Sequence, residues 1–181
     1  MRTALRGYRA ATMNAVLPVT PTSSSAARVD LGGLVQAVSQ SVAEDGLLNP
    51  FTPEQWELLA GYLLPMQVEA GHTLFTQGVQ DRTLYFIESG SCSVHYEDDK
   101  GRLRLAIVGA GSVVGEGAFF SHRPRSATVQ AGAPSRLWTL TALRFSELSN
   151  RQPAVALALA MAAGSVLARR LGNRRRRVAA T

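Results

Sequence analysis

The sequence predicts a mainly β fold with flanking helices, in which an antiparallel jelly-roll β-barrel spans about residues 64–141. The first reason is that short apolar runs alternate with polar or small residues across this region, as in half-buried strands. The second is that turn signals separate the runs at Gly71, Gly78, Ser89-Gly90, Asp98–Gly101 and Gly109–Gly111. Short strands at regular spacing with glycine turns are typical of an antiparallel barrel.

Residues 1–28 are predicted to be a disordered leader. They contain Pro18, Pro21 and the serine run 23–25, which are typical of loops. The folded domain is therefore expected over residues 29–172.

Two helices are predicted before the barrel. The first begins at the N-cap Asp30 and runs toward Gly46. Its apolar residues recur at helical spacing and are Leu31, Leu34, Val35, Val38 and Val42. The second begins at Thr52, with Pro53 in the first helical position and Gln55 bonding back to the cap. Its apolar face is expected to contain Trp56, Leu59 and Leu63.

The strands are predicted from alternating apolar residues. These residues are Met66, Val68, Leu74, Leu84, Phe86, Cys92, Val94, Tyr96, Leu103, Leu105 and Ile107. A short helix interrupts the pattern after Gly115, and strands resume over Ser126–Ala131 and Ser135–Leu140. Helical spacing returns over about residues 142–172, where a long helix is expected from about Pro153 to Leu171.

The composition is that of one folded domain in a reducing compartment. With 46% hydrophobic and 18% charged residues, the 181-residue chain is able to bury a core. The single cysteine, Cys92, excludes an intrachain disulfide and indicates the cytoplasm. The most apolar run, Ala154–Ala168, is shorter than the roughly 20 residues that cross a bilayer, so we expect no membrane span.

The net charge of +6 is concentrated in C-terminal arginines. They are Arg169, Arg170, Arg174, Arg175, Arg176 and Arg177. Without these six, the basic residues equal the 13 acidic residues in number. We expect an Arg-rich tail over residues 173–181 and a solvated helix end that the helix dipole favours. Binding to nucleic acid without sequence preference, to anionic lipid or to an acidic partner is the alternative.

Residues 115–129, GEGAFFSHRPRSATV, carry the candidate site. Gly115 precedes a short helix whose first residue is Glu116, and Arg125 follows after a turn. Small residues surround the two charges: Gly117, Ala118, Ser126 and Ala127. Free N–H groups and a guanidinium suit a phosphate, whereas a carboxylate suits a sugar hydroxyl, so the segment predicts a nucleotide site. A turn glycine, a first-turn carboxylate and a simple pair between Glu116 and Arg125 are the alternatives.

This segment resembles the phosphate-binding cassette of the cyclic-nucleotide-binding domain family, on Gly115-Glu116 and on Pro124–Val129. The run Leu84–Gly90, followed by Val94, supports the resemblance, which covers about residues 47–150. Gly117 departs from the family pattern, because an aliphatic residue usually follows the glutamate.

The resemblance implies a role for each cassette residue. Glu116 accepts the ribose 2′-hydroxyl, and Arg125 pairs with the cyclic phosphate. The N–H groups of Gly117, Ala118 and Ser126 or Ala127 complete the anion cradle. The implied regulatory ligand is cAMP or cGMP, with cAMP favoured and no metal required. Binding is then signalled through the C-terminal helix to a protein effector.

The C-terminal helix also suggests a homodimer through residues 153–171, because apolar residues recur there at heptad-like spacing. They are Leu157, Ala160, Gly164, Leu167 and Leu171. A second, small-residue stripe contains Ala156, Ala160, Gly164 and Ala168. Packing of this helix against the chain's own barrel, or its contact with a membrane, is the alternative.

Three functions remain open from the sequence. The first is a cyclic-nucleotide sensor, for which we expect no helix-turn-helix domain after the long helix. The second is a DNA-binding regulator of the catabolite-activator type that uses the basic tail, although no specific nucleic-acid binding is expected. The third is an interaction module that binds no nucleotide. An enzyme is not expected, because His72, His95 and His122 are scattered without catalytic or metal-ligand spacing.

Overall fold

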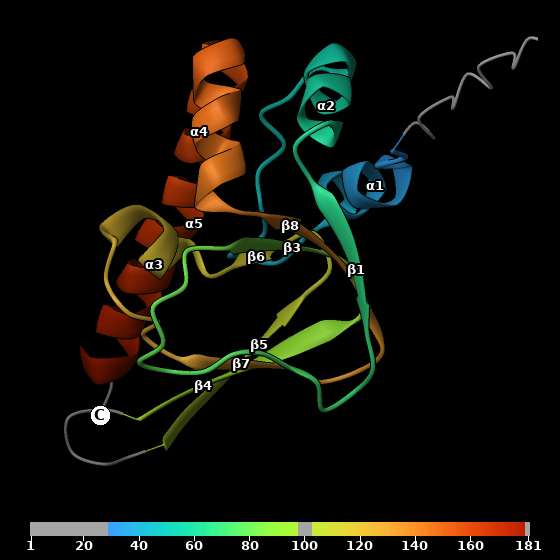
Figure 1. Cartoon of the computed structure of the whole chain (residues 1–181). Coiled ribbons are helices and arrows are strands. Elements are labelled where there is room, and N and C mark those ends of the chain that lie inside the picture. Colours follow the sequence, from blue (N-terminus) through green and yellow to red (C-terminus); the bar gives the residue numbers. More distant parts are fainter. Residues whose placement is uncertain (1–28, 98–102, 180–181) are drawn as a thin grey trace, which may run out of the picture.

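The computed structural model describes residues 29–97 and 103–179, so the predicted leader, residues 1–28, lies outside the described residues. Helices α1 (Gly32–Gln40) and α2 (Pro53–Ala60) come first, and the strands follow. After the strands, α4 (Ala142–Arg151) and α5 (Pro153–Ala179) complete the fold. Figure 1 shows α2 and α4 above two tiers of strands, with α5 descending beside them.

The strands form two four-stranded sheets in which every pairing is antiparallel. The first sheet has the order β1 (Leu64–Val68), β8 (Ser135–Leu140), β3 (Leu84–Ser89) and β6 (Val113–Val114). The second has the order β2 (Thr73–Phe75), β7 (Thr128–Ala131), β4 (Ser91–Glu97) and β5 (Leu103–Gly109). The mainly β prediction is therefore confirmed.

The predicted closed barrel is not formed within the described residues. Among the described strands, no hydrogen-bonded pair joins the two sheets, and the chain passes from one sheet to the other through turns. The turn at Gly71 leads from β1 to β2, and the turn at Gly111 leads from β5 to the two-residue strand β6. The edges of both sheets therefore stay open, and the architecture is two facing antiparallel sheets with helices.

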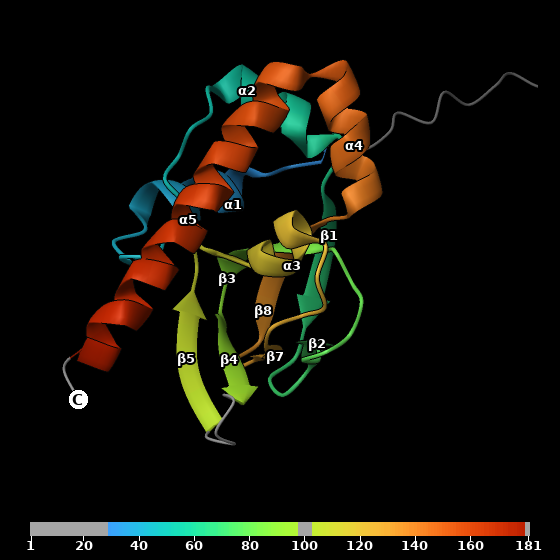
Figure 2. The same ribbon diagram turned by 90° about the vertical axis from the view of Figure 1, so that its left-hand side faces the viewer.

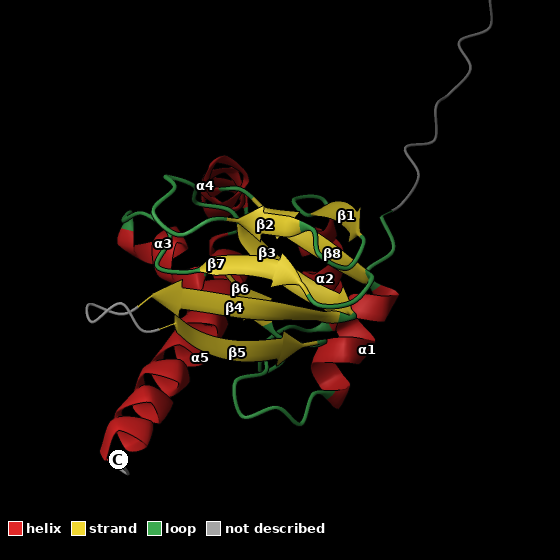
Figure 3. Cartoon of the chain, turned by 90° about the horizontal axis from the view of Figure 1, so that it is seen from below, coloured by secondary structure: helices red, strands yellow, loops and turns green. Residues whose placement is uncertain are grey.

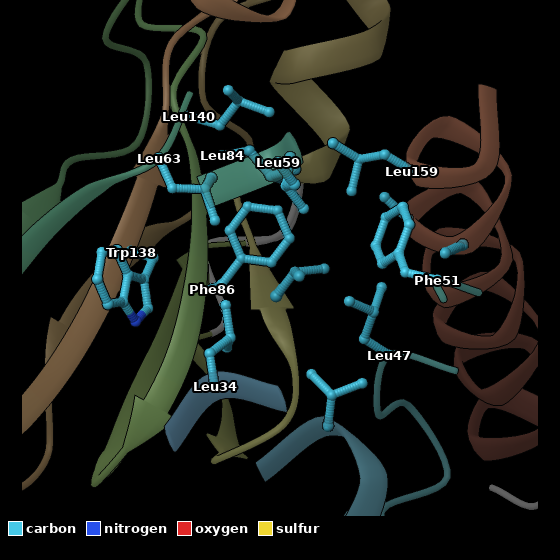
Figure 4. Packing of buried hydrophobic residues seen from close by; sticks show 14 of the residues in the cluster. Leu34, Leu47, Phe51, Leu59, Leu63, Leu84, Phe86, Trp138, Leu140 and Leu159 are labelled. Atoms are coloured by element: carbon cyan, nitrogen blue, oxygen red, sulfur yellow. The ribbon is translucent and has the colours of Figure 1, made fainter. Parts of the chain in front are cut away.

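The first sheet is covered on both faces. Leu84 and Phe86 of β3 belong to an apolar cluster with the helices. Tyr85 and Ile87, which point the opposite way, belong to a cluster between the two sheets. Figure 4 shows Phe86 among side chains of the first cluster from α1, α2 and α5. These two clusters fix the position of β3, whose preceding loop carries part of the site.

The predicted helix starts are close to those observed. Thr52 Oγ1 accepts a hydrogen bond from Gln55 N at 3.4 Å, and Gln55 Oε1 accepts one from Thr52 N at 3.1 Å, so the capping box is present. The first helix begins one residue later than expected, with N-cap Leu31, while Asp30 bonds Gly32 N. It ends at Gln40, so the prediction for Val42, which is 99% exposed, was wrong.

The apolar side of β5 faces outward. Leu103, Leu105 and Ile107 are 71%, 58% and 74% exposed, although their alternation resembles that of a core-facing strand. In Figure 3 the second sheet lies in front, and β5 is its edge strand. Alternation shows that a strand has two faces, but it does not show which face is covered.

Helix α5 continues past the predicted end at Leu171 to Ala179. Its first half packs into the apolar core. By length and composition, Pro153–Asn173 is able to cross a membrane, contrary to the sequence estimate. A core helix passes the same test, and α5 buries Val155, Leu159 and Val166 in the cluster below the helices. Figure 2 shows α5 along one side of the molecule, with α3 (Glu116–Ser121) beside it and above the strands.

The exposed stripe of α5 is rotated from the predicted one. Ala160 and Leu167 are half-buried, whereas Met161 is 69% exposed. The exposed stripe contains Ala154, Leu157, Met161, Ala168 and Leu171, with the half-buried Gly164 in register.

Candidate functional site

Gly115 forms the turn on which the candidate site is built. It is the N-cap of α3, with a φ of 90° that residues with a side chain rarely adopt. A Cβ at this position would lie 2.4 Å from Arg125 Nη1 and 2.7 Å from the Thr83 carbonyl oxygen. The missing side chain at Gly115 therefore makes room for the Arg125 guanidinium.

Arg125 is held in place through both its backbone and its side chain. Its N–H donates to the Val79 carbonyl at 2.9 Å, and its own carbonyl accepts from Gly78 N at 2.8 Å. These bonds tie the end of the cassette to the loop between β2 and β3, and they direct the side chain inward, where it is 1% exposed.

The Arg125 guanidinium makes four hydrogen bonds. Nε and Nη2 donate to Asp81 Oδ2, Nη2 donates to the Thr83 carbonyl at 2.7 Å, and Nη1 donates to the Gly115 carbonyl at 3.0 Å. The group also lies over the Phe75 ring, 3.9 Å from its centroid. Because guanidinium has five N–H donors, one N–H of Nη1 has no partner among the described residues.

Asp81 is the charge partner of Arg125. Burial opposes ionisation of this carboxyl, but hydrogen bonds from Arg125 and Thr83 outweigh it, so its pKa lies below the usual value. Thr83 contributes two of these bonds to Oδ1, from its hydroxyl at 2.8 Å and from its N–H at 3.1 Å. The proposed pairing of Arg125 with Glu116 is therefore wrong in this structure.

Glu116 is paired with Arg170 of α5. Arg170 Nη1 donates to Glu116 Oε1 at 2.8 Å, while its Nε donates to Asp45 Oδ2 at 2.9 Å. Arg169 donates to the Gly46 carbonyl at 2.7 Å. The solvated helix end was predicted for Arg174–Arg177, whose side chains lie outside the described residues. Arg169 and Arg170, whose charges were counted with the tail, instead lie on the face of α5 that contacts the loop before α2 and the cassette.

The remaining cassette residues lie around the same turn. Ala118 and Ala127 are buried, Gly117 is half-buried and Ser126 is exposed. A Cβ on Gly117 would lie 3.9 Å from Ser126 Oγ, so the two ends of the cassette are neighbours. The N–H groups of Gly117 and Ala118 lie in the first turn of α3, where amides lack a partner within the helix. The structure thus brings all seven predicted residues together.

Sequence reasoning missed the partners of both charges. Asp81 and Thr83 form a D-x-T turn directly before β3, which is a local signal of a carboxylate held at a strand start. Arg170 carried no such signal, because its partners Asp45 and Glu116 are distant in sequence. Only the packing of α5 brings the three together.

Two clefts lie beside the site rather than at its charges. One of 470 Å³ is lined by the loop before β3 and the start of α4, including Asp81 and Thr83. One of 330 Å³ is lined by Glu44, Arg169, Gly172 and Asn173. Glu116 and Arg125 line neither of these two clefts.

The comparisons with known proteins agree with this fold. Residues 65–152 match the sequence model of the cyclic nucleotide-binding domain family. The matched residues include strands β2 to β8, the cassette and helix α4.

One curated relative is the cAMP-dependent protein kinase type II regulatory subunit of Drosophila melanogaster, 36% identical over 73 residues. These cover 40% of this chain and 19% of that protein, so the chain spans only a small part of its relative.

Solved structures share the fold. A cyclic nucleotide-binding domain from Methylobacillus flagellatus superposes with a TM-score of 0.71 over 82% of both chains, at 21% identity. The catabolite activator protein of Thermus thermophilus has a TM-score of 0.62 and 28% identity, over 73% of this chain and 61% of its own.

Proposed function

We propose that this chain is a cytoplasmic regulatory protein that binds a cyclic nucleotide and is not itself an enzyme. One observation carries the proposal. The turn at Gly115 brings a buried carboxylate, Glu116, and a buried guanidinium, Arg125, onto one short segment. This segment lies within the residues that match the cyclic nucleotide-binding domain family. A salt bridge would also explain two opposite charges, but these two charges have other partners.

The roles proposed for the cassette follow from its donors and acceptors. Glu116 accepts the ribose 2′-hydroxyl, since a carboxylate would repel the phosphate. The phosphate accepts the remaining Nη1 N–H of Arg125 and the free amides of Gly117 and Ala118. The amide of Ser126 or Ala127 closes the cradle. Because Asp81 already neutralises Arg125, the amides carry more of the anion binding than the sequence alone suggests.

We favour cAMP over cGMP as the ligand. The support is the cAMP-dependent kinase subunit among the relatives.

We also propose that α5 reports binding to a protein effector. Among the described helices, α5 is the one that pairs with the cassette through opposite charges, from Arg170 to Glu116.

The exposed stripe of α5 has the alternating three- and four-residue spacing of two helices that pack together, and its Leu157 and Met161 are 64% and 69% exposed. This supports a homodimer through α5. Sedimentation should show a dimer that Met161→Glu converts to a monomer; a wild-type monomer at high concentration would exclude it.

Thermal unfolding with cAMP, cGMP, AMP and GMP tests the proposed ligand. A ligand at 100 times its Kd stabilises the native state by about 2.7 kcal/mol. For a chain of this size that corresponds to a Tm increase of roughly 5–10 °C. We expect cAMP to give the largest increase and the non-cyclic nucleotides to give little.

Control experiments distinguish the three candidate functions: nucleotide sensor, DNA-binding regulator and interaction module. Glu116→Ala should abolish the cAMP shift, whereas Glu147→Ala removes an equal charge from an exposed position of α4 and should preserve it. No shift with any nucleotide would favour the interaction module. DNA binding that survives moderate salt would favour the regulator of the catabolite-activator type, because tail binding collapses with salt.

A further inference from the structure

Arg170 is the residue through which α5 meets the cassette. Besides Glu116 and Asp45, its guanidinium donates from Nη2 to Ser112 Oγ at 3.1 Å. One side chain thus joins four segments: α5, the loop before α2, the turn before β6 and the start of α3. Its side chain is 22% exposed, so these contacts are partly shielded from water.

The opposite charges of Arg170 and its two carboxylate partners stabilise this contact. Burial alone would lower the pKa of Arg170, but Glu116 and Asp45 outweigh that effect and raise it, so the guanidinium stays charged. Glu116 is 7% exposed, and a buried carboxylate needs a cation or several donors to remain stable. Within the described part of the chain, Arg170 is the cation within ion-pair distance of Glu116.

Among the described residues, only one oxygen of Glu116 has a hydrogen-bond partner. Arg170 binds Oε1, whereas Oε2 accepts no hydrogen bond from the residues that the structure describes. A carboxylate has about four acceptor sites over its two oxygens. A hydroxyl is therefore able to donate to Oε2 while Arg170 remains on Oε1, so the guanidinium and the sugar need not compete.

The two halves of α5 are attached differently. Val155, Leu159 and Val166 root the first half in the apolar core. The later turns are attached through polar contacts, which include Arg169 to the Gly46 carbonyl and Asn173 to Glu44 at 3.2 Å. Segments with few buried apolar contacts open most readily, so the polar half is the part whose docking responds to a change at Glu116.

We infer that Arg170 is a positioning residue, which holds the Glu116 carboxylate in place through Oε1 and leaves Oε2 available for a sugar hydroxyl. This rests on the proposed function, because it assumes that a cyclic nucleotide binds at the cassette. Since coupling between two sites is reciprocal, sugar binding in turn strengthens the docking of the polar half of α5.

The test compares cAMP with 2′-deoxy-cAMP, which lacks the hydroxyl. In the wild type, calorimetry should show at least about tenfold tighter binding of cAMP, as expected for a hydrogen bond to a charged group. Arg170→Ala should reduce this ratio to about two, and Arg170→Lys should restore part of it. Arg151→Ala removes the same charge from an exposed position of α4, away from the polar half of α5, and it should leave the ratio unchanged.

Two outcomes would overturn the inference. An equal loss of affinity for both nucleotides in Arg170→Ala would show that α5 only packs against the domain. A wild type that binds neither nucleotide would instead remove the proposed function. Hydrogen exchange without nucleotide tests the contact separately: Glu116→Gln should speed exchange in α5 around residues 169–173. Unchanged exchange would show that the Glu116 contact does not hold this half of the helix.

Discussion

Replacing Arg125 by alanine should destabilise the chain even when no nucleotide is added. The substitution removes four hydrogen bonds and leaves the carboxylate of Asp81 without its cation. Breaking a buried ion pair by removing one partner costs about 3–5 kcal/mol. Asp81 keeps 31% exposure and is able to regain water, so we expect the lower end, about 3 kcal/mol.

A loss of this size is measurable by thermal or urea unfolding. For a chain of this length, 1 kcal/mol shifts the Tm by roughly 2–4 °C, so the expected decrease is roughly 6–12 °C. The matched control is Arg123→Ala, which removes the same charge from an exposed position two residues away. Arg125→Ala within about 2 °C of both wild type and control would refute the structural role of Arg125. A lost nucleotide affinity in this variant is informative only after its stability has been measured.

Three further predictions concern the same turn and the core. Gly115→Ala should cost at least about 2 kcal/mol, because an L-residue in the left-handed region costs roughly 1–2 kcal/mol and the new Cβ displaces Arg125. The carboxyl pKa of Asp81 is lowered by folding, so its contribution to stability is complete above about pH 4, the unfolded value, and is lost as the pH falls through the folded pKa. The stability difference between wild type and Arg125→Ala should therefore narrow on acidification to about pH 2. Burial raises the pKa of the Cys92 thiol to about 11, so alkylation at pH 8 should be slow in the folded chain and fast in urea.

Each of these has an outcome that contradicts it. Gly117→Ala is the control for Gly115→Ala, because Gly117 lies inside α3 and its new Cβ would meet only Ser126 Oγ, at 3.9 Å. An equal loss of stability at both positions would argue against the turn geometry at Gly115. If urea unfolding gave the same stability difference between wild type and Arg125→Ala at every pH, the ion pair of Asp81 with Arg125 would not explain the stabilisation. Alkylation of native Cys92 at the rate of a free thiol would contradict its burial.

The local elements of the fold were predictable because their signals are local. The Thr52–Gln55 capping box lies within one helical turn, and the strands end at glycine turns. The cassette was predictable for the same reason, since Glu116 and Arg125 lie on one contiguous segment. The outward face of β5 and the open edges of the sheets were not, because both depend on which element covers which face.

By itself, the sequence determined that a cassette with one carboxylate, one guanidinium and small neighbours interrupts a series of antiparallel strands. The tertiary structure decided which groups those charges contact. Arg125 pairs with Asp81 because the loop before β3 binds the backbone of the cassette, and Glu116 pairs with Arg170 because the apolar half of α5 sets the position of its polar half. Charged pairs of this kind join segments far apart in the chain, and no local periodicity encodes them.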